Sequence, residues 1–383
     1  MLKSIFGARE STGHASATRI EPSYQRPFVA FISNVDSVYR FSPEDTLESA
    51  QASMRLRVGI PARELARRVP VFLLPLDYLE DDPELTRLGI PHAIVVGKAP
   101  ARFFVEEADA AHALVEWVEK TARKHRVVVD FSDDVIAAAE MASHFDVVQL
   151  QKRLLNACEA TVPSDALRTR LAAEGAHPIH VIEDPYEAAE GAPRFSPGEP
   201  LRLVWFGVFA AAFRSYLESE LCAIAGRVAG RALELAFVTY AQAAPLVQEM
   251  QTAVRKVNPR FSITHVPWSL ETVRVELERA DLVLLPQEVE SAWGRVKSHN
   301  RLVDAIRAGR FAIASPIPSY LELASYAWVG ANLATGIEWA LHHPDEVQDR
   351  LTAGQIYVAE RFDPVVIGAK WAEVLQIPRA AAA

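Results

Sequence analysis

Short apolar runs recur along the chain and have the length of buried β-strands. They are residues 27–33, 71–76, 93–96, 127–131 and 160–162 in the first half, and residues 201–206, 233–239, 261–266, 281–286 and 311–315 in the second half. Segments whose apolar residues have helical spacing lie between these runs. Strands that alternate with helices predict parallel sheets with right-handed crossovers. The pattern therefore indicates an α/β fold.

The expected helices follow from the same spacing. They cover residues 108–124, 270–280 and 297–309, a stretch over residues 44–68 with a break at residues 59–61, and a final series over residues 336–342, 344–355 and 355–375. Gly309 stands where a helix commonly ends in a left-handed residue. These helices supply the crossovers that parallel strands require.

A segment dense in proline and glycine, residues 191–200, separates the two series of strands and predicts a linker. We therefore expect one domain over residues 27–190 and a second over residues 201–355, followed by a helix and tail over residues 356–383. A chain of 383 residues is long enough for two hydrophobic cores. Residues 1–26 show no sustained period and predict a mobile tail.

Composition narrows the classes of function. A net charge of -9 argues against broad nucleic-acid binding, which requires a basic surface. Cys158 and Cys222 are the two cysteines, and without close spacing they suggest neither a disulfide framework nor a zinc site. No apolar run approaches the ~18 residues of a membrane span, and the first 25 residues are too polar for a secretory signal. We expect a cytoplasmic protein, with peripheral membrane contact by its first residues left open.

Residues 280–323 combine a strand, a polar loop, a helix and a second strand, with basic and amide side chains where the helix starts. Arg295, Lys297 and Arg301 can neutralise a phosphate there, Ser298 can cap the helix, and Asn300 can bind a neutral group. In a parallel sheet this edge is where ligands bind, because free backbone N–H groups and the positive helix end point out of it. The alternative is a solvated basic helix start with an ordinary cap.

Asp304 follows Asn300 by one helical turn and lies on the same side of the predicted helix. A carboxylate at this position can accept hydrogen bonds from ribose hydroxyls, as the acidic residue of dinucleotide sites does. Gly207 comes directly after the first strand of the second domain. Glycine there allows the backbone to approach a phosphate, although a glycine required only for packing is the alternative.

The first domain carries a run of acidic residues after the strand at residues 127–131. Asp130 and Asp133 are candidates for a general base or a hydroxyl-binding residue, because carboxylates at the end of a parallel strand face the ligand edge. The alternative is a helix cap at Ser132 or Asp133 with first-turn acids that favour the helix dipole, and we assign Asp134 to this structural role. The run is not a metal-binding Asp-x-Asp motif, so we infer no metal.

The second half resembles the GT-B glycosyltransferases, in particular the nucleotide-sugar transferases of bacterial surface-polysaccharide assembly. The residues that carry the resemblance are Pro286, Lys297, Asn300, Arg301, Asp304-Ala305, Gly309 and Ala314-Ser315. The passage at Pro163-Ser164 and the Asp-Pro-aromatic corner at residues 184–186 extend it into the first half. The resemblance implies two Rossmann-like domains that face each other across a cleft, with the last helix crossing back to the first domain.

The resemblance also implies roles for further residues. In the family the second domain holds the nucleotide sugar, and Arg214 stands where a residue contacts the diphosphate. Trp268 stands where the base is contacted and could stack on it or belong to the core, and Glu322 stands in a loop near the donor or simply starts a helix. Arg55 matches an element near the acceptor cleft, with a solvated arginine as the alternative.

Asp304 takes the place of the second of two glutamates in the retaining enzymes, but Val296 and Lys297 stand where the first is expected. The stereochemistry of transfer is therefore open. We expect a glycosyltransferase that uses a UDP-, GDP- or dTDP-sugar and a glycan or other acceptor, and no separate cofactor. A catalytically silent GT-B protein in an assembly complex is the alternative, and the absent signal peptide argues against a solute-binding protein.

Overall fold

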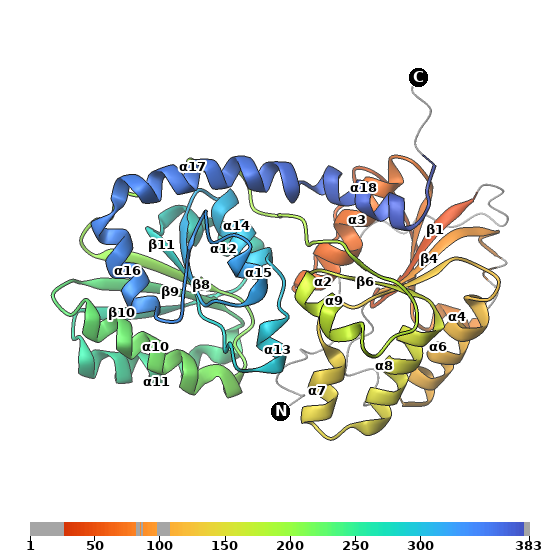
Figure 1. The fold of residues 1–383 in the computed structure, drawn as a ribbon, viewed down its shortest axis with the longest axis horizontal. Coiled ribbons are helices and arrows are strands. Elements are labelled where there is room, and N and C mark those ends of the chain that lie inside the picture. The colour runs from red at the N-terminus through yellow and green to blue at the C-terminus, as the bar shows by residue number, and fades with distance from the viewer. Residues whose placement is uncertain (1–26, 82–84, 86, 98–107, 379–383) are drawn as a thin grey trace. The chain divides into compact units, whose positions relative to one another are not determined.

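The computed structural model describes residues 27–81, 85, 87–97 and 108–378, which form two compact units (Figure 1). The C-terminal domain is Tyr186–Phe362. The N-terminal domain contains the described residues up to Pro185 and those from Asp363 onward. The chain therefore crosses between the domains twice. The predicted tail at residues 1–26 lies outside the described residues.

The N-terminal domain is built on a seven-stranded sheet of order β2-β3-β1-β4-β5-β6-β7. Its strands are β1 (Phe28–Ser33), β2 (Tyr39–Phe41), β3 (Val71–Pro75), β4 (Pro91–Val96), β5 (Val127–Asp130), β6 (Glu159–Val162) and β7 (Ile179–Val181). All neighbours pair in parallel except β2, which is antiparallel to β3. Every residue of β1 is buried, as expected for a parallel strand that is covered on both faces.

The helical elements of this domain are α2 (Ala52–Met54), the π-helical turn η1 (Arg55–Gly59), α3 (Ile60–Ala66), α4 (Tyr78–Asp81), α6 (Ala108–Thr121), α7 (Val135–Met141), α8 (Phe145–Ala157), α9 (Asp165–Leu171) and α18 (Pro364–Val374). The helix predicted from residue 44 begins only at Ala52, and residues 44–51 are irregular. The predicted break at residues 59–61 is the end of η1, after which α3 continues. Trp371 of α18 is fully buried beside Phe31 of β1.

The C-terminal domain has a six-stranded parallel sheet of order β10-β9-β8-β11-β12-β13. Its strands are β8 (Leu201–Phe206), β9 (Leu233–Thr239), β10 (Phe261–Pro267), β11 (Leu282–Leu285), β12 (Phe311–Ala314) and β13 (Trp328–Val329). In chain order this is 3-2-1-4-5-6, the order of the Rossmann fold. The order reverses between β8 and β11, and this point determines where a ligand is expected.

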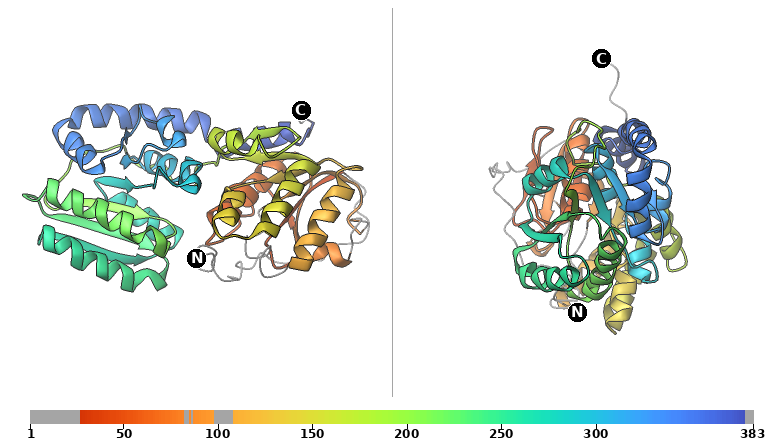
Figure 2. Two further views of the ribbon diagram at one scale, coloured as in Figure 1. Left: turned by 60° about the horizontal axis from the view of Figure 1, so that its bottom comes forward. Right: turned by 90° about the vertical axis from the view of Figure 1, so that its left-hand side faces the viewer.

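Helices cover both faces of the second sheet. They are α10 (Arg214–Arg227), α11 (Ala244–Val257), α12 (Leu270–Arg279), α13 (Ala292–Arg295), α14 (Asn300–Arg307), α15 (Pro318–Leu321), α16 (Leu333–His342) and α17 (Pro344–Arg361), with short 3-10 turns η2 (Ala211–Phe213) and η3 (Ala241–Ala243). Apolar residues of α10, α11, α16 and the first half of α17 form the core of one face. Those of α12, α14 and the last part of α17 form the core of the other. Figure 2 shows α10 and α11 side by side along one face.

The division of the chain differs from the predicted linker. The crossing lies at Pro185 and Tyr186, before residues 191–200, because the following segment is bound to the C-terminal domain. Gly191 donates its N–H to the Arg307 carbonyl at 3.1 Å, and Phe195 is buried in the core of this domain. The predicted break at residue 355 is also displaced. Helix α17 continues to Arg361, and Asp363 caps α18 by accepting from the Val365 N–H.

Within the described residues, no helix is both long enough and apolar enough to span a bilayer. The same residues contain no group of three or more His, Cys, Asp or Glu side chains arranged to hold a metal ion.

The packing of α18 predicts a large effect of Trp371→Ala. Removing a buried tryptophan leaves a cavity and should lower the free energy of unfolding by about 3–5 kcal/mol. Val365 is 58% exposed on the same helix, so Val365→Ala should change it by less than about 0.5 kcal/mol. Urea unfolding followed by circular dichroism measures both. Equal stability of the two variants would contradict the assignment of α18 to the core of the N-terminal domain.

Candidate functional site

The carboxyl ends of β8 and β11 meet at the point where the strand order of the C-terminal sheet reverses. Gly207 follows β8 with a φ of +146°, a conformation that strongly favours glycine. A side-chain carbon at Gly207 would lie 3.2 Å from Nη1 of Arg301. The same Nη1 donates to the Phe206 carbonyl at 3.4 Å. The structure thus brings together the glycine and the basic helix start, which are almost one hundred residues apart in sequence.

The loop between β11 and α14 is fastened at several points. Trp293 of α13 lies beneath the Lys297 ammonium, with Nζ 3.3 Å from the ring centroid. Ser319 of α15 donates its hydroxyl to the Lys297 carbonyl at 2.7 Å. Near the start of the loop, the Gln287 N–H donates to the Ser315 hydroxyl at 2.9 Å. These contacts attach the loop to α13, to α15 and to the end of β12.

We call residues 297–301 the basic turn. The sequence predicts that Ser298 caps the following helix, and this is wrong. Helix α14 begins at Asn300, and its N-cap position is His299, which makes no side-chain cap. The Asn300 side-chain oxygen instead accepts from the N–H of Arg301 at 2.7 Å. Lys297, Ser298, Asn300 and Arg301 are each partly exposed, so a ligand can reach this face of the turn.

Asp304 has a different partner from the predicted ribose. Its side chain is almost fully buried, and Oδ1 accepts from the backbone N–H groups of Glu187 at 3.0 Å and Ala188 at 3.1 Å. These two residues follow the first crossing between domains. The carboxylate therefore fixes the path of the chain into the C-terminal domain.

Glu322 lies after α15 and forms an ion pair with two residues. Its Oε2 is 3.0 Å from Nη2 of Arg361 and 3.2 Å from Nε2 of His299. The adjacent His299 imidazole, and then Arg361, hold the pKa of Glu322 below its ordinary value. Glu322 is thus joined to the basic turn through His299, and its place near the donor stays a prediction. The role as a simple helix-start residue is not observed, because α15 ends before it.

The remaining donor candidates, Arg214 and Trp268, are also partly exposed, and both have contacts within the C-terminal domain. Arg214 begins α10 and pairs with Glu249 at 2.5 Å and with Glu218 at 3.5 Å, so its charge is already neutralised. Trp268 follows β10, donates its N–H to the Thr239 carbonyl at 2.8 Å, and packs partly against the core. The contact with the core agrees with the core alternative, and stacking of Trp268 on a base stays a prediction.

In the N-terminal domain the structure places Asp130 in the interior. Its Oδ1 is 2.6 Å from Nη2 of Arg57 and accepts from the Thr161 hydroxyl at 2.7 Å. Arg57 also contacts Asp184 at 3.3 Å and donates to the Ile182 carbonyl. The side chain of Asp130 is fully buried. A carboxylate held in this network is a structural ion pair and is badly placed to exchange protons with a substrate.

The other acidic residues of this run have separate roles. Asp134 is the N-cap of α7 and accepts from the Ala137 N–H at 2.8 Å, which confirms its structural role and replaces the predicted cap at Ser132 or Asp133. Burial raises the pKa of Asp134. Asp133 is partly exposed and stays a candidate for chemistry. Arg55, the third candidate in this domain, is buried in η1 and donates to the Ser49 carbonyl, so it is not the solvated arginine of the alternative.

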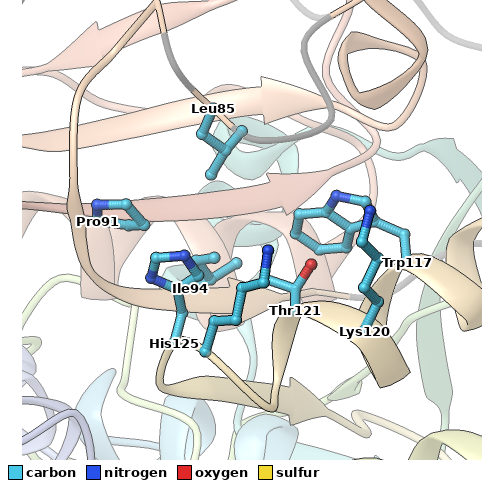
Figure 3. Close-up of a pocket in the computed structure, with 8 residues that line it drawn as sticks. Leu85, Pro91, Ile94, Trp117, Lys120, Thr121 and His125 are labelled. Carbon is cyan, nitrogen blue, oxygen red and sulfur yellow. The ribbon is translucent and has the colours of Figure 1, made fainter.

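A small hollow lies at the opposite edge of the N-terminal sheet (Figure 3). Pro91 at the start of β4, Trp117 and Lys120 of α6, and His125 line it. Its volume of about 20 Å³ is room for about one water molecule. It is therefore too small for a sugar, and it lies away from the strand ends where ligands of parallel sheets bind.

Sequence reasoning did not find the contacts that fasten the basic turn. Trp293, Ser319 and Tyr216, whose hydroxyl donates to the Gln287 carbonyl at 2.9 Å, lie on other elements. Their spacing along the chain carries no motif. His299 lies inside the predicted turn, but nothing in its sequence neighbourhood indicates that it alone is buried.

Several solved structures share this architecture. HepE of Anabaena, in complex with UDP and glucose, has a TM-score of 0.60 and 15% identity over 91% of this chain and 99% of that chain. A glycosyltransferase from Rickettsia africae has a TM-score of 0.52 and 10% identity over 92% and 98% of the two chains. A trehalose-6-phosphate protein from E. coli, bound with UDP-2-fluoro glucose, has a TM-score of 0.58 and 9% identity over 92% and 99%.

These likenesses show that the chain has the GT-B fold, and the predicted fold class is confirmed. No protein-family model matches the sequence, and no curated protein matches it. At identities this low, the shared fold does not transfer a site residue from any of these proteins.

The buried ion pair predicts a structural defect in Asp130→Asn. Removing the charge leaves Arg57 without its nearest anion in the interior, which should lower the free energy of unfolding by about 3–5 kcal/mol. Asp165→Asn is the matched control, because its pair with Arg168 is exposed and should contribute less than about 1 kcal/mol. Chemical unfolding of both variants measures the difference. A stable Asp130→Asn protein would contradict the assignment of Asp130 to a structural ion pair, and Asp130 would again be a candidate for catalysis.

Proposed function

We propose that the chain is a glycosyltransferase that moves a sugar from a nucleotide-sugar donor to a glycan or another acceptor. The observation that carries the proposal is the meeting of Gly207 with the basic turn where the strand order reverses. Glycine allows a phosphate to approach the backbone, and the basic side chains can neutralise it. The names of the similar structures support the choice of ligand, since HepE is described with UDP-glucose and with UDP.

The C-terminal domain is the donor domain in this proposal. Transfer leaves a nucleoside diphosphate whose negative charge grows as the bond to the sugar breaks. Lys297 and Arg301 stabilise that charge, and their effect is largest in a site that is organised before the donor arrives. Asn300 is placed to bind a neutral group of the donor. We take UDP-sugars as the first probes, with GDP- and dTDP-sugars as the alternatives.

The N-terminal domain is the acceptor domain, with Asp133 as the base that removes the proton of the acceptor hydroxyl. Arg55 and Asp130 support this edge of the sheet from within, because both are buried. The free thiols Cys158 and Cys222 are consistent with a reducing compartment, so we place the reaction in the cytoplasm. Assembly of a bacterial surface polysaccharide is the process that the sequence resemblance favours.

A catalytically silent nucleotide-binding protein is the second candidate. It is favoured by Asp304, whose carboxylate is bound to the backbone, and by Asp130, which is held by Arg57. Release of UDP from a panel of UDP-sugars, measured with and without mixed glycan acceptors, separates the two candidates. Sugar-dependent release supports the transferase, whereas binding without release supports the silent protein.

Lys297→Ala should weaken the binding of UDP-glucose by about 1.5–3 kcal/mol, the range for a hydrogen bond to a charged group. Lys256→Ala removes an exposed lysine from the end of α11 and should leave the dissociation constant unchanged. Isothermal titration calorimetry measures both constants. Unchanged affinity in Lys297→Ala would remove this lysine from the donor site.

Asp133→Asn should lower turnover by ~10²-fold or more while the affinity for UDP-glucose stays nearly the same, because general-base help is lost and the donor domain is unaltered. Asp146→Asn, an exposed acid in the first turn of α8, is the control and should keep full turnover. Full activity of a folded Asp133→Asn protein would overturn the role as base. Lost donor affinity would instead show that Asp133 belongs to the donor side.

A further inference from the structure

His299 differs from every other residue of the basic turn. Lys297, Ser298, Asn300 and Arg301 are partly exposed, whereas His299 is 1% exposed. Its imidazole is therefore enclosed by the C-terminal domain, whereas the side chains of its neighbours reach the surface. Imidazole carries a polar atom at each side of the ring, and burying it is unfavourable unless it has partners. The buried His299 ring therefore matters either for the conformation of the turn or for its charge.

The surroundings of the ring are charged on one side and apolar on the other. Nε2 is 3.2 Å from Oε2 of Glu322, and the ring centroid is 5.4 Å from that of Phe362. Neither ring nitrogen has a partner with hydrogen-bond geometry, so the contact with Glu322 is electrostatic. Arg361 holds the same Glu322 oxygen at 3.0 Å.

Residues 319–322 contact the basic turn at Lys297 as well as at His299. Ser319 donates its hydroxyl to the Lys297 carbonyl at 2.7 Å, and Glu322 lies three residues after Ser319. The basic turn is therefore attached to α15 and its end at two points, one through the backbone and one through the His299 ring.

We propose that His299 is a positioning residue for the donor diphosphate. Held beside Glu322, it fixes the backbone of the basic turn so that Lys297 and Asn300 are aimed before the donor binds, and it does so without touching the donor. Preorganisation of this kind raises affinity because less conformational freedom is lost on binding. The inference rests on the proposed function, since it assumes that the turn binds a nucleotide sugar.

The test compares the dissociation constant of UDP-glucose for wild type, His299→Leu and His299→Gln. His299→Leu should bind about tenfold more weakly than wild type, a loss of ~1.4 kcal/mol. His299→Gln keeps an amide N–H for Glu322 and should recover most of this affinity. His342→Leu, which replaces an exposed histidine of α16, is the control and should behave as wild type.

Wild-type affinity in a folded His299→Leu protein would overturn the proposal. If His299→Leu does not fold, Glu322→Gln decides, because loss of the anion that holds the imidazole should also weaken the binding of UDP-glucose, and wild-type affinity in that variant contradicts the proposal. A wild type that binds none of UDP-, GDP- and dTDP-glucose would refute the proposed function itself, and the role of His299 with it.

Discussion

The contact between the Arg301 guanidinium and the backbone at Phe206 and Gly207 is the constraint on which the proposed donor site depends. It joins the end of β8 to the start of α14, the two places where a Rossmann-like sheet exposes backbone N–H groups and a positive helix end. Any larger residue at position 207 would meet this guanidinium. The site thus arises from the strand order, which places Gly207 at the end of β8 beside the basic start of α14.

Helix α14 connects this site to the path of the chain between domains. At its start lie Asn300 and Arg301, which face the proposed donor. Farther along, Asp304 binds the backbone of Glu187 and Ala188, and Arg307 pairs with Glu190 at 2.9 Å. One short helix therefore carries the residues expected to bind the donor and the residues that hold the segment after the first crossing. A protein with a net charge of -9 concentrates positive charge where an anionic ligand would bind.

The fold could be predicted from the sequence because its signals are local. Buried parallel strands appear as continuous apolar runs, and β9 matches the predicted range of residues 233–239 at both ends. The exceptions are short edge strands such as β2 and β13, whose few residues carry too little pattern. The Gly207 and Arg301 candidates also followed from local rules for strand ends and helix starts, and the structure brings them together.

The roles of Asp130 and Asp304 could not be predicted, because their partners are distant in sequence. Arg57 lies 73 residues from Asp130, and Glu187 lies 117 residues from Asp304. A carboxylate at a strand end or on a helix face has the same local signature whether it binds a ligand or the protein itself. Burial decides between the two, and burial depends on the packing of the whole domain.

Hydrogen–deuterium exchange of the wild-type chain, with and without excess UDP, tests the central claim most directly. The account predicts slower exchange of backbone amides after β8, around Gly207, and in the basic turn through the first residues of α14, with α8 unchanged. Protection confined to the N-terminal domain, or UDP binding that leaves both of these segments unaltered, would contradict a donor site at this point of the C-terminal sheet.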